Sequence, residues 1–320
     1  MNKKYILVTG GTGFIGSSIV KKLIFLGHNL IILDNNFRGN LKRLDKVKSK
    51  LIFVNADIRN EKKVFQVFNK YKIKCVIHLA YINGTKNFYK MPFEIIEIAA
   101  KGTLNILEAC KRNKVKQCFL ASSSEVYADP KIIPTPEEIE LTIPQLSNPR
   151  FSYGGGKIMI ELLGYYYGKK YFKKMIIFRP HNVYSHDMGN DHVIPELIQK
   201  ILKYKFSKNK NKKIFIQGTG NETRAFTYID DFVKGFETIF KKGKHLNVYN
   251  IGNDKQTSIK TLVKIICNKF KVNGKIGYRR KFLGSPSKRC PDISKIKKLG
   301  FVPAIDIKQG LDILIKNYER

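Results

Sequence analysis

The chain of 320 residues carries 60 Lys and Arg against 25 Asp and Glu, a net charge of +35, and is 43% hydrophobic. This length suits one large or two modest domains, and the lack of an apolar run of about 18 residues excludes a membrane-spanning helix. The apolar run near the basic N-terminus is too short for a signal peptide, and five cysteines without metal-ligand spacing fit a reducing compartment such as the cytoplasm.

The positive charge would also fit a nucleic-acid-binding protein. The lysines are spread along the whole chain, however, and only residues 203–213 form a concentrated basic run. Lys, Asn and Ile share A/T-rich codons, so a skewed genome explains their abundance. We therefore expect no nucleic-acid partner, although a basic surface favours anionic substrates through long-range attraction.

Short apolar runs alternate with helical patterns along the first part of the chain. The predicted strands are 5–9, 30–34, 51–55, 74–79, 116–121 and 174–179. The predicted helices are 14–26, 61–71, 93–113 and 152–171, followed by 192–204 and 258–270. Nearly continuous apolar strands in strand–helix alternation predict an α/β protein with a Rossmann-type, doubly wound parallel sheet.

A glycine pattern joins the first strand to the first helix. Gly10, Gly13 and Gly16 in "VTGGTGFIGSS" allow a tight turn and a close approach to a pyrophosphate at the helix N-terminus. Asp34 ends the second strand, where a carboxylate accepts hydrogen bonds from ribose hydroxyls and repels a 2′-phosphate, which favours NAD over NADP. An ordinary strand-end turn is the alternative for Asp34, and the nearby Arg38 leaves NADP open.

Tyr153 and Lys157 are four residues apart, so they share one face of a helix. A nearby ammonium favours the phenolate and is expected to lower the pKa of Tyr153, which then takes a proton from a hydroxyl while hydride leaves the same carbon. "ASSSEVY" (121–127) places serines at the end of the fifth strand, where substrates bind in this fold class.

Three glycines follow Tyr153 in "NPRFSYGGGKIMIELL", although glycine weakens a helix by about 1 kcal/mol relative to alanine. Two explanations stay open. Gly154 to Gly156 keep the helix surface bare so that the cofactor or another helix comes close, or they lie in a frayed first turn after Pro149.

With these motifs the chain resembles the extended short-chain dehydrogenase/reductase family, which contains nucleotide-sugar epimerases, dehydratases and decarboxylases. The resemblance runs almost end to end. It rests on "TGGTGFIGS", "HLA" (78–80), "KGTLNILEAC" (101–110), "SSSEVY", "YGGGK", "FRPHNVY" (178–184), "GTGNETRAFTYIDD" (218–231), "YNIGN" (249–253) and "KRCPDISKIKKLGF" (288–301). It implies an NAD-binding Rossmann domain over 1–180, with 225–252 returning to it, and a mainly nucleotide-sugar-binding region over 181–320.

The resemblance also implies roles for individual residues. Tyr153 would be the base, Lys157 its partner and Ser123 the hydroxyl donor, while Asn182, Arg224 and Arg289 would hold the nucleotide diphosphate. The expected cofactor-binding residues are Gly10, Gly13, Phe14, Ile15, Gly16, Asp34, Asn35, Asp57, Ile58, Leu79, Ala80, Tyr153 and Lys157. Two alternatives remain: Asp57 caps the next helix, and the two arginines form surface ion pairs. The helices at 93–113 and 152–171 would form a homodimer interface.

Three positions depart from the family pattern, namely Ala128, Ser185-His186 and Ala99, and they bear on the sugar pocket. The expected chemistry is oxidation at C4 to a 4-keto sugar by an epimerase or dehydratase. Glu125 is a candidate base at C5, or else a hydrogen-bonding residue of the cofactor loop. "SSEVY" makes UDP-glucuronate decarboxylation the alternative, and a non-catalytic NAD-binding or RNA-binding protein is the competing class.

Overall fold

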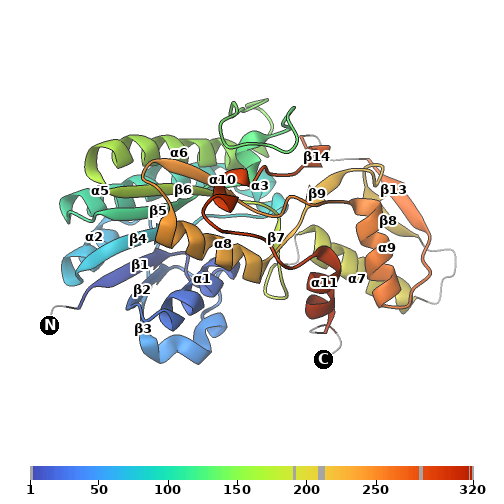
Figure 1. Cartoon of the computed structure of the whole chain (residues 1–320), viewed down its shortest axis with the longest axis horizontal. Coiled ribbons are helices and arrows are strands. Elements are labelled where there is room, and N and C mark those ends of the chain that lie inside the picture. Colours follow the sequence, from blue (N-terminus) through green and yellow to red (C-terminus); the bar gives the residue numbers. More distant parts are fainter. Residues whose placement is uncertain (1–2, 190–191, 208–212, 281–283, 317, 319–320) are drawn as a thin grey trace.

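A seven-stranded parallel sheet forms the larger part of the molecule (Figure 1). The structure is a computed structural model and describes residues 3–189, 192–207, 213–280, 284–316 and 318. Its strands lie in the order β11-β6-β5-β4-β1-β2-β3. They are β1 (Tyr5–Thr9), β2 (Leu30–Asp34), β3 (Leu51–Asn55), β4 (Ile73–His78), β5 (Gln117–Ala121), β6 (Lys174–Pro180) and β11 (Asn247–Ile251). The six predicted strands agree with β1 to β6 within one residue at each end.

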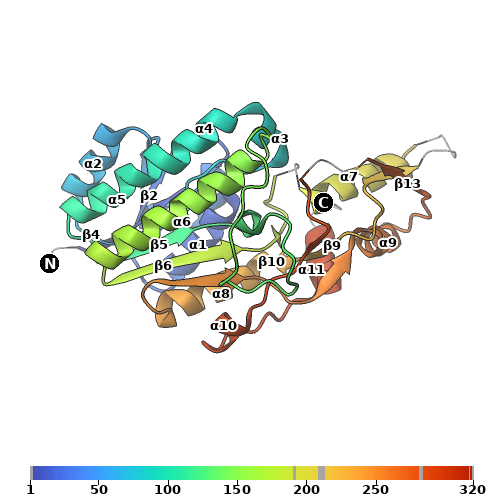
Figure 2. The ribbon, with the colours of Figure 1, turned by 90° about the horizontal axis from the view of Figure 1, so that it is seen from above.

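Helices cover both faces of this sheet because alternate strand residues point to opposite sides. In β1, Ile6 and Val8 pack in one core and Leu7 packs in the other. The first core holds α1 (Phe14–Phe25) and α8 (Ile229–Lys242), and the second holds α2 (Glu61–Lys70), α4 (Pro92–Glu97), α5 (Thr103–Arg112) and α6 (Phe151–Tyr171). Figure 2 shows α2, the rod formed end to end by α4 and α5, and α6 side by side over one face.

The predicted helix over 93–113 is interrupted. Between α4 and α5 a π-helical turn spans Ile98–Gly102, and a side chain at Gly102 would meet Ile58 at 2.5 Å. A 3₁₀ helix η1 (Leu41–Lys50) and the short α3 (Thr85–Lys90) were not predicted either. A π turn, a 3₁₀ segment or a six-residue helix carries too little α-helical periodicity to be read from sequence.

The rest of the chain forms a smaller region beyond the carboxyl ends of the strands, at the right of Figure 1. Its helices are α7 (Val193–Lys205), α9 (Ile259–Lys269) and α11 (Ile307–Ile315). The short α10 (Ser294–Lys297) instead packs against β11 and α8 of the large sheet. Its strands are β7 (Val183–Tyr184), β8 (Ile214–Gln217), β9 (Thr223–Ala225), β10 (Thr227–Tyr228), β12 (Gln256–Ser258), β13 (Ile276–Arg279) and β14 (Lys288–Arg289). Residues 208–212 of the basic run lie outside the described residues.

The order of the strands fixes where a ligand binds. The chain runs from β1 through β2 to β3, then crosses to the other side of β1 to form β4. The carboxyl ends of β1 and β4 therefore meet at a topological switch point, where open α/β sheets bind their ligands. Among the residues described, no helix is long and apolar enough to cross a bilayer.

Candidate active site

A pocket of about 410 Å³ opens at this switch point. Loops that follow β1, β2, β3, β4 and β5 line it, together with α6 and part of the smaller region. The predicted residues found in its lining are Gly10, Gly13, Phe14, Ile15, Gly16, Asp34, Asn35, Asp57, Ile58, Leu79, Ala80, Ser123, Glu125, Tyr153, Lys157, Asn182 and Arg289. The fold thus brings all but one of the predicted site residues to one cavity.

The glycine loop has a shape that only glycines allow. Gly10 has a φ of +70°, and a Cβ there would lie 2.7 Å from the backbone nitrogen of Ala80. A Cβ at Gly16 would overlap the carbonyl oxygen of Gly10. Gly13 caps α1 without a side-chain hydrogen bond, so the amides of the first helical turn face the pocket as an anion site.

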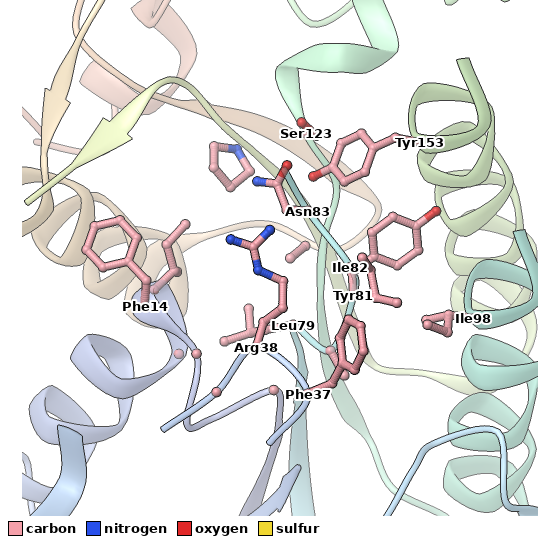
Figure 3. Close-up of a pocket in the computed structure, with 18 of the residues that line it drawn as sticks. Phe14, Phe37, Arg38, Leu79, Tyr81, Ile82, Asn83, Ile98, Ser123 and Tyr153 are labelled. Atoms are coloured by element: carbon pink, nitrogen blue, oxygen red, sulfur yellow. The ribbon is translucent and has the colours of Figure 1, made fainter. Parts of the chain in front are cut away.

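Asp34 is fixed at the end of β2 by its own loop. Its Oδ2 accepts a hydrogen bond from the Thr12 amide at 3.0 Å, and its Oδ1 accepts one from the Asn36 amide at 2.9 Å. Each carboxylate oxygen keeps a second acceptor direction for a ribose hydroxyl. Arg38 extends away from this carboxylate: its guanidinium lies where a side chain at Gly84 or Gly189 would be, in the middle of the pocket (Figure 3).

Asp57 lies at the far end of the pocket in an ion pair. Its carboxylate contacts Arg59 at 2.8 Å and accepts a hydrogen bond from the Asn35 amide group at 3.0 Å. Burial raises the pKa of Asp57, but the hydrogen bonds from Arg59 outweigh burial and lower it. Asn60, and not Asp57, caps α2 by accepting from the Lys63 amide, so the helix-cap alternative is wrong.

Tyr153 faces Ser123 across the inner end of the pocket. Figure 3 shows the Tyr153 hydroxyl directed into the cavity, beside Ser123 and Asn83. Burial raises the pKa of Tyr153, and a hydrogen bond with Ser123 partly offsets that rise. The ring is held by Tyr81 and Phe88, whose centroids lie 5.2 and 4.7 Å away.

Lys157 does not act on Tyr153 as predicted. Its buried ammonium donates a hydrogen bond to the Ala121 carbonyl at 2.8 Å and lies 4.0 Å from the centre of the Tyr81 ring, but 5.9 Å from that of Tyr153. Burial lowers the pKa of Lys157 to about 7, although Glu161 opposes this. In the protein without cofactor, the prediction that Lys157 lowers the pKa of Tyr153 is therefore wrong.

Glu125 is held between two arginines. Its Oε1 lies 2.6 Å from Arg289 Nη1, and its Oε2 lies 3.3 Å from Arg150 Nη2. Burial raises the pKa of Glu125, but the charges of Arg289, Arg150 and Arg224 overcome this and bring it to about 2. The carboxylate is therefore ionised at neutral pH and is a poor proton donor.

The predicted diphosphate residues divide into two groups. Asn182 and Arg289 line the pocket, whereas Arg224 is absent from its lining and donates to the carbonyls of Thr223 and Pro286 at 2.8 and 2.9 Å. Burial lowers the pKa of Arg224 to about 10, with the neighbouring Arg289 adding to the effect. None of the three arginines around Glu125 is a surface ion pair.

The three glycines of α6 are explained by close neighbours. A Cβ at Gly154 would lie 3.1 Å from the carbonyl oxygen of Glu125, and a Cβ at Gly156 would overlap the Tyr81 hydroxyl. Gly155 faces Ile143 at 3.2 Å. All three lie inside the helix, which begins at Phe151. The frayed-turn explanation is therefore wrong. The neighbours that come close are the Tyr81 and Ile143 loops, the short 3₁₀ helix of Glu125 and, at Gly156, Ala99 of the π-helical turn.

Comparison with known proteins agrees with this geometry. The family model described as "NAD dependent epimerase/dehydratase family" matches residues 6–252. The chain belongs to the NAD-dependent epimerase/dehydratase family. A "Putative UDP-glucose 4-epimerase" of Methanocaldococcus jannaschii is 34% identical over 310 residues, covering 96% of this chain and 95% of the relative.

Two further family members extend the comparison. UDP-glucuronic acid decarboxylase 1 of Xenopus tropicalis is 29% identical over 322 residues, covering 100% of this chain and 73% of the relative. The crystal structure of UDP-glucose 4-epimerase from Thermotoga maritima with UDP-glucose superposes with a TM-score of 0.87, at 27% identity and 98% coverage of both chains. Members of the family thus differ in reaction while sharing one fold.

NAD is the cofactor of this family, and the residues of the pocket fit it. The glycine loop leaves a space that side chains at Gly10 and Gly16 would fill. Hydrogen bonds from two backbone amides fix the orientation of the Asp34 carboxylate. The glycine loop would hold the pyrophosphate and Asp34 the adenosine ribose. Lys157 and Tyr153 lie at the opposite end, where the nicotinamide half would be held.

Sequence reasoning missed two side chains of the site. Arg150 pairs with Glu125 and comes three residues before Tyr153; that closeness to Tyr153 in the sequence was the available signal. Tyr81 contacts both Tyr153 and Lys157. Only its position directly after "HLA" pointed to it, and that position says nothing of which way the ring turns.

Proposed function

We propose that this protein oxidises C4 of a nucleotide-diphosphate sugar to a 4-keto intermediate and then reduces it again. One observation carries the proposal: Ser123, Tyr153 and Lys157 line the same pocket as the dinucleotide-binding glycine loop and Asp34. A protein that only bound NAD would not need a buried hydroxyl pair and a buried lysine at the inner end of its cofactor pocket.

Each residue has a role that fits its position. Tyr153 removes the proton from the C4 hydroxyl, and Ser123 holds the same oxygen by a hydrogen bond. Lys157 supplies positive charge on the same helix face and donates to the cofactor ribose. NAD, when bound, would supply the hydride acceptor and donor for C4. The ionised Tyr153 is otherwise disfavoured, because burial raises its pKa.

The surroundings of Glu125 favour 4-epimerisation over dehydration. Dehydration would need Glu125 to remove the C5 proton, but Arg289 and Arg150 hold its carboxylate and bring its pKa to about 2, so it is a weak base. Ser124 offers no second carboxyl group to protonate the departing hydroxyl. Epimerisation needs only the Ser123 and Tyr153 hydroxyls and the cofactor, all of which the pocket provides.

Decarboxylation of a hexuronate is a second candidate, favoured by the arginines. Arg150 and Arg289 are each more than nine-tenths buried, and the Nε of each has no hydrogen-bond partner among the described residues. With Arg224 they place three positive charges around one carboxylate. This excess of positive charge suits a substrate that carries an anionic group, either a diphosphate or a C6 carboxylate.

The nucleotide diphosphate is proposed to bind to the smaller region, which corresponds mainly to residues 181–320. Asn182 and Arg289 would contact it from the pocket wall. Arg224 would act through its neighbour, because Arg224 and Arg289 are paired across β9 and β14.

We also propose a homodimer that buries the outer face of α4, α5 and α6. These helices pack against one another and leave large apolar side chains exposed. They are Phe93, Ile96, Leu104, Leu162, Tyr165 and Tyr166. An apolar face of this kind on neighbouring helices is what a second copy covers. Light scattering should give twice the mass of the wild type, and Leu162→Lys should give a monomer.

A proton NMR time course tests the reaction. Purified protein with NAD is mixed with UDP-, GDP- and dTDP-hexoses and with UDP-glucuronate. A new anomeric signal without loss of mass supports epimerisation, and loss of carbon dioxide from the uronate supports the second candidate. No turnover of any sugar, together with salt-sensitive RNA binding, would favour a non-catalytic protein.

A further inference from the structure

The Lys157 ammonium is held by contacts that the roles above do not explain. Its Nζ donates to the Ala121 carbonyl at 2.8 Å, and the face of Tyr81 lies 4.0 Å from it. Lys157 is only 3% exposed, at the pocket wall, so little solvent screens its charge. A ring face at this distance attracts a cation, and the attraction is strongest where water is excluded.

Tyr81 is held over Lys157 by the gap at Gly156. The Tyr81 hydroxyl occupies the space that a Cβ at Gly156 would fill, and the Ala99 methyl group bounds the same gap at 3.0 Å. The hydroxyl has no hydrogen-bond partner among the residues described, so it adds no polar contact of its own. Figure 3 shows this hydroxyl directed towards the helices, away from the cavity that Tyr153 faces.

We propose that Tyr81 is a positioning residue, whose ring face holds the Lys157 ammonium charged and in place at the Ala121 carbonyl. The proposal rests on the function given above for Lys157. It also explains the glycine at position 156, because a side chain there would overlap the Tyr81 hydroxyl and displace the ring. A loop that follows β4 is thereby coupled to the reacting end of α6.

Other charged and titratable groups also face Lys157. Glu161 lies one turn further along α6 and favours the charged lysine, but both of its oxygens are engaged by Arg179 of β6. His78 of β4 is a neighbour, and burial together with the Lys157 charge lowers its pKa to about 3, so it stays neutral. Tyr153 lies 5.9 Å from the ammonium. Tyr81 is the group from another element whose ring face lies over the ammonium, which is 4.0 Å from the ring centre.

Competitive labelling of Lys157 tests the proposal without any sugar. Trace acetic anhydride is applied to the protein from pH 5 to 10, and mass spectrometry of the peptide containing Lys157 gives the pH at which its amine becomes reactive. The pocket gives the reagent access, because Lys157 lines it. Tyr81→Leu should lower this pH by about one unit, while Tyr81→Phe, which keeps the ring, should leave it unchanged.

A second pair of variants gives the same test through Gly156. Gly156→Ala should displace Tyr81 and lower the titration pH of Lys157, and combining it with Tyr81→Phe, which removes the overlapping hydroxyl, should restore the wild-type value. Circular dichroism checks the fold of each variant. The proposal is overturned if both Tyr81→Leu and Gly156→Ala titrate like the wild type, or if Tyr81→Phe shifts as far as Tyr81→Leu. A failed sugar assay leaves this result unaffected.

Discussion

Glu161→Ala should be one of the most destabilising single changes in this protein. Glu161 accepts hydrogen bonds from Arg179 Nε at 2.8 Å and Nη2 at 2.6 Å, and a further one from the Ser122 hydroxyl. The side chains of the pair are only 3% and 8% exposed. The substitution therefore leaves the Arg179 charge buried with only neutral partners, the Tyr127 hydroxyl and the Glu137 carbonyl.

The expected loss follows from the burial of the remaining charge. Removing one partner of a buried ion pair costs about 3–5 kcal/mol. The unfolding entropy of a 320-residue chain is roughly 0.7 kcal/mol per degree near the melting temperature, at about 2 cal/mol per degree for each residue. The melting temperature should therefore fall by about 4–7 °C, as measured by differential scanning fluorimetry of the protein alone.

Glu138→Ala is the matched control. Glu138 pairs with Lys295 at 2.7 Å, a distance close to that of the buried pair, but its side chain is 66% exposed. An exposed pair contributes about 0–1 kcal/mol, so this variant should melt within about 1–2 °C of the wild type. If Glu161→Ala melted no lower than Glu138→Ala, burial of the charge would not be what makes the difference.

Four further outcomes are expected. Tyr153→Phe should lower turnover by about 10²- to 10⁴-fold while NAD still binds in a calorimetric titration; an unchanged rate would remove Tyr153 from the reaction. Asp34→Ala should weaken NAD far more than NADP in the same titration, since the carboxylate that discriminates between them is gone. Ala128→Gly should raise the free energy of unfolding in urea by about 1 kcal/mol, because Ala128 has a φ of +51° that alanine tolerates poorly. Glu125→Gln should be less stable than the wild type by a constant amount above about pH 5. The difference should shrink between pH 4.5 and 2, because the folded pKa of about 2 lies below the ordinary 4.5 and the contribution is lost only as the carboxylate protonates; a difference that stays constant down to pH 2 would contradict this.

The parallel sheet was predictable because its central strands are buried on both faces. Runs such as Leu30–Asp34 are apolar at nearly every position, and glycines and helical patterns bound them clearly. The short strands beyond residue 180 carry no such pattern. β9 has three residues and pairs with β12 and β14, so its neighbours along the sheet come from distant parts of the chain.

The residues of the candidate site also fall into those that the sequence predicted and those that it did not. Gly10, Asp34 and Ser123 were found because each lies at or just beyond the carboxyl end of a strand, and these strand ends meet at one edge of the sheet. Arg150 and Tyr81 were missed because what they contact depends on how two loops fold onto α6. The pKa of Tyr153 was mispredicted for a related reason: spacing along a helix does not tell where the Lys157 ammonium points.

The position of β11 in the sheet bears on how the protein is made. β11 pairs with β6 along Ile176 to Pro180, yet the whole of α7 and α8 is synthesised between the two strands. During synthesis on the ribosome, one edge of β6 therefore stays unpaired until β11 has been made. Until then, the backbone at Ile176 and Phe178 can pair with another chain. A nascent protein cut short before Tyr249 is the form that we expect to aggregate and to need a chaperone.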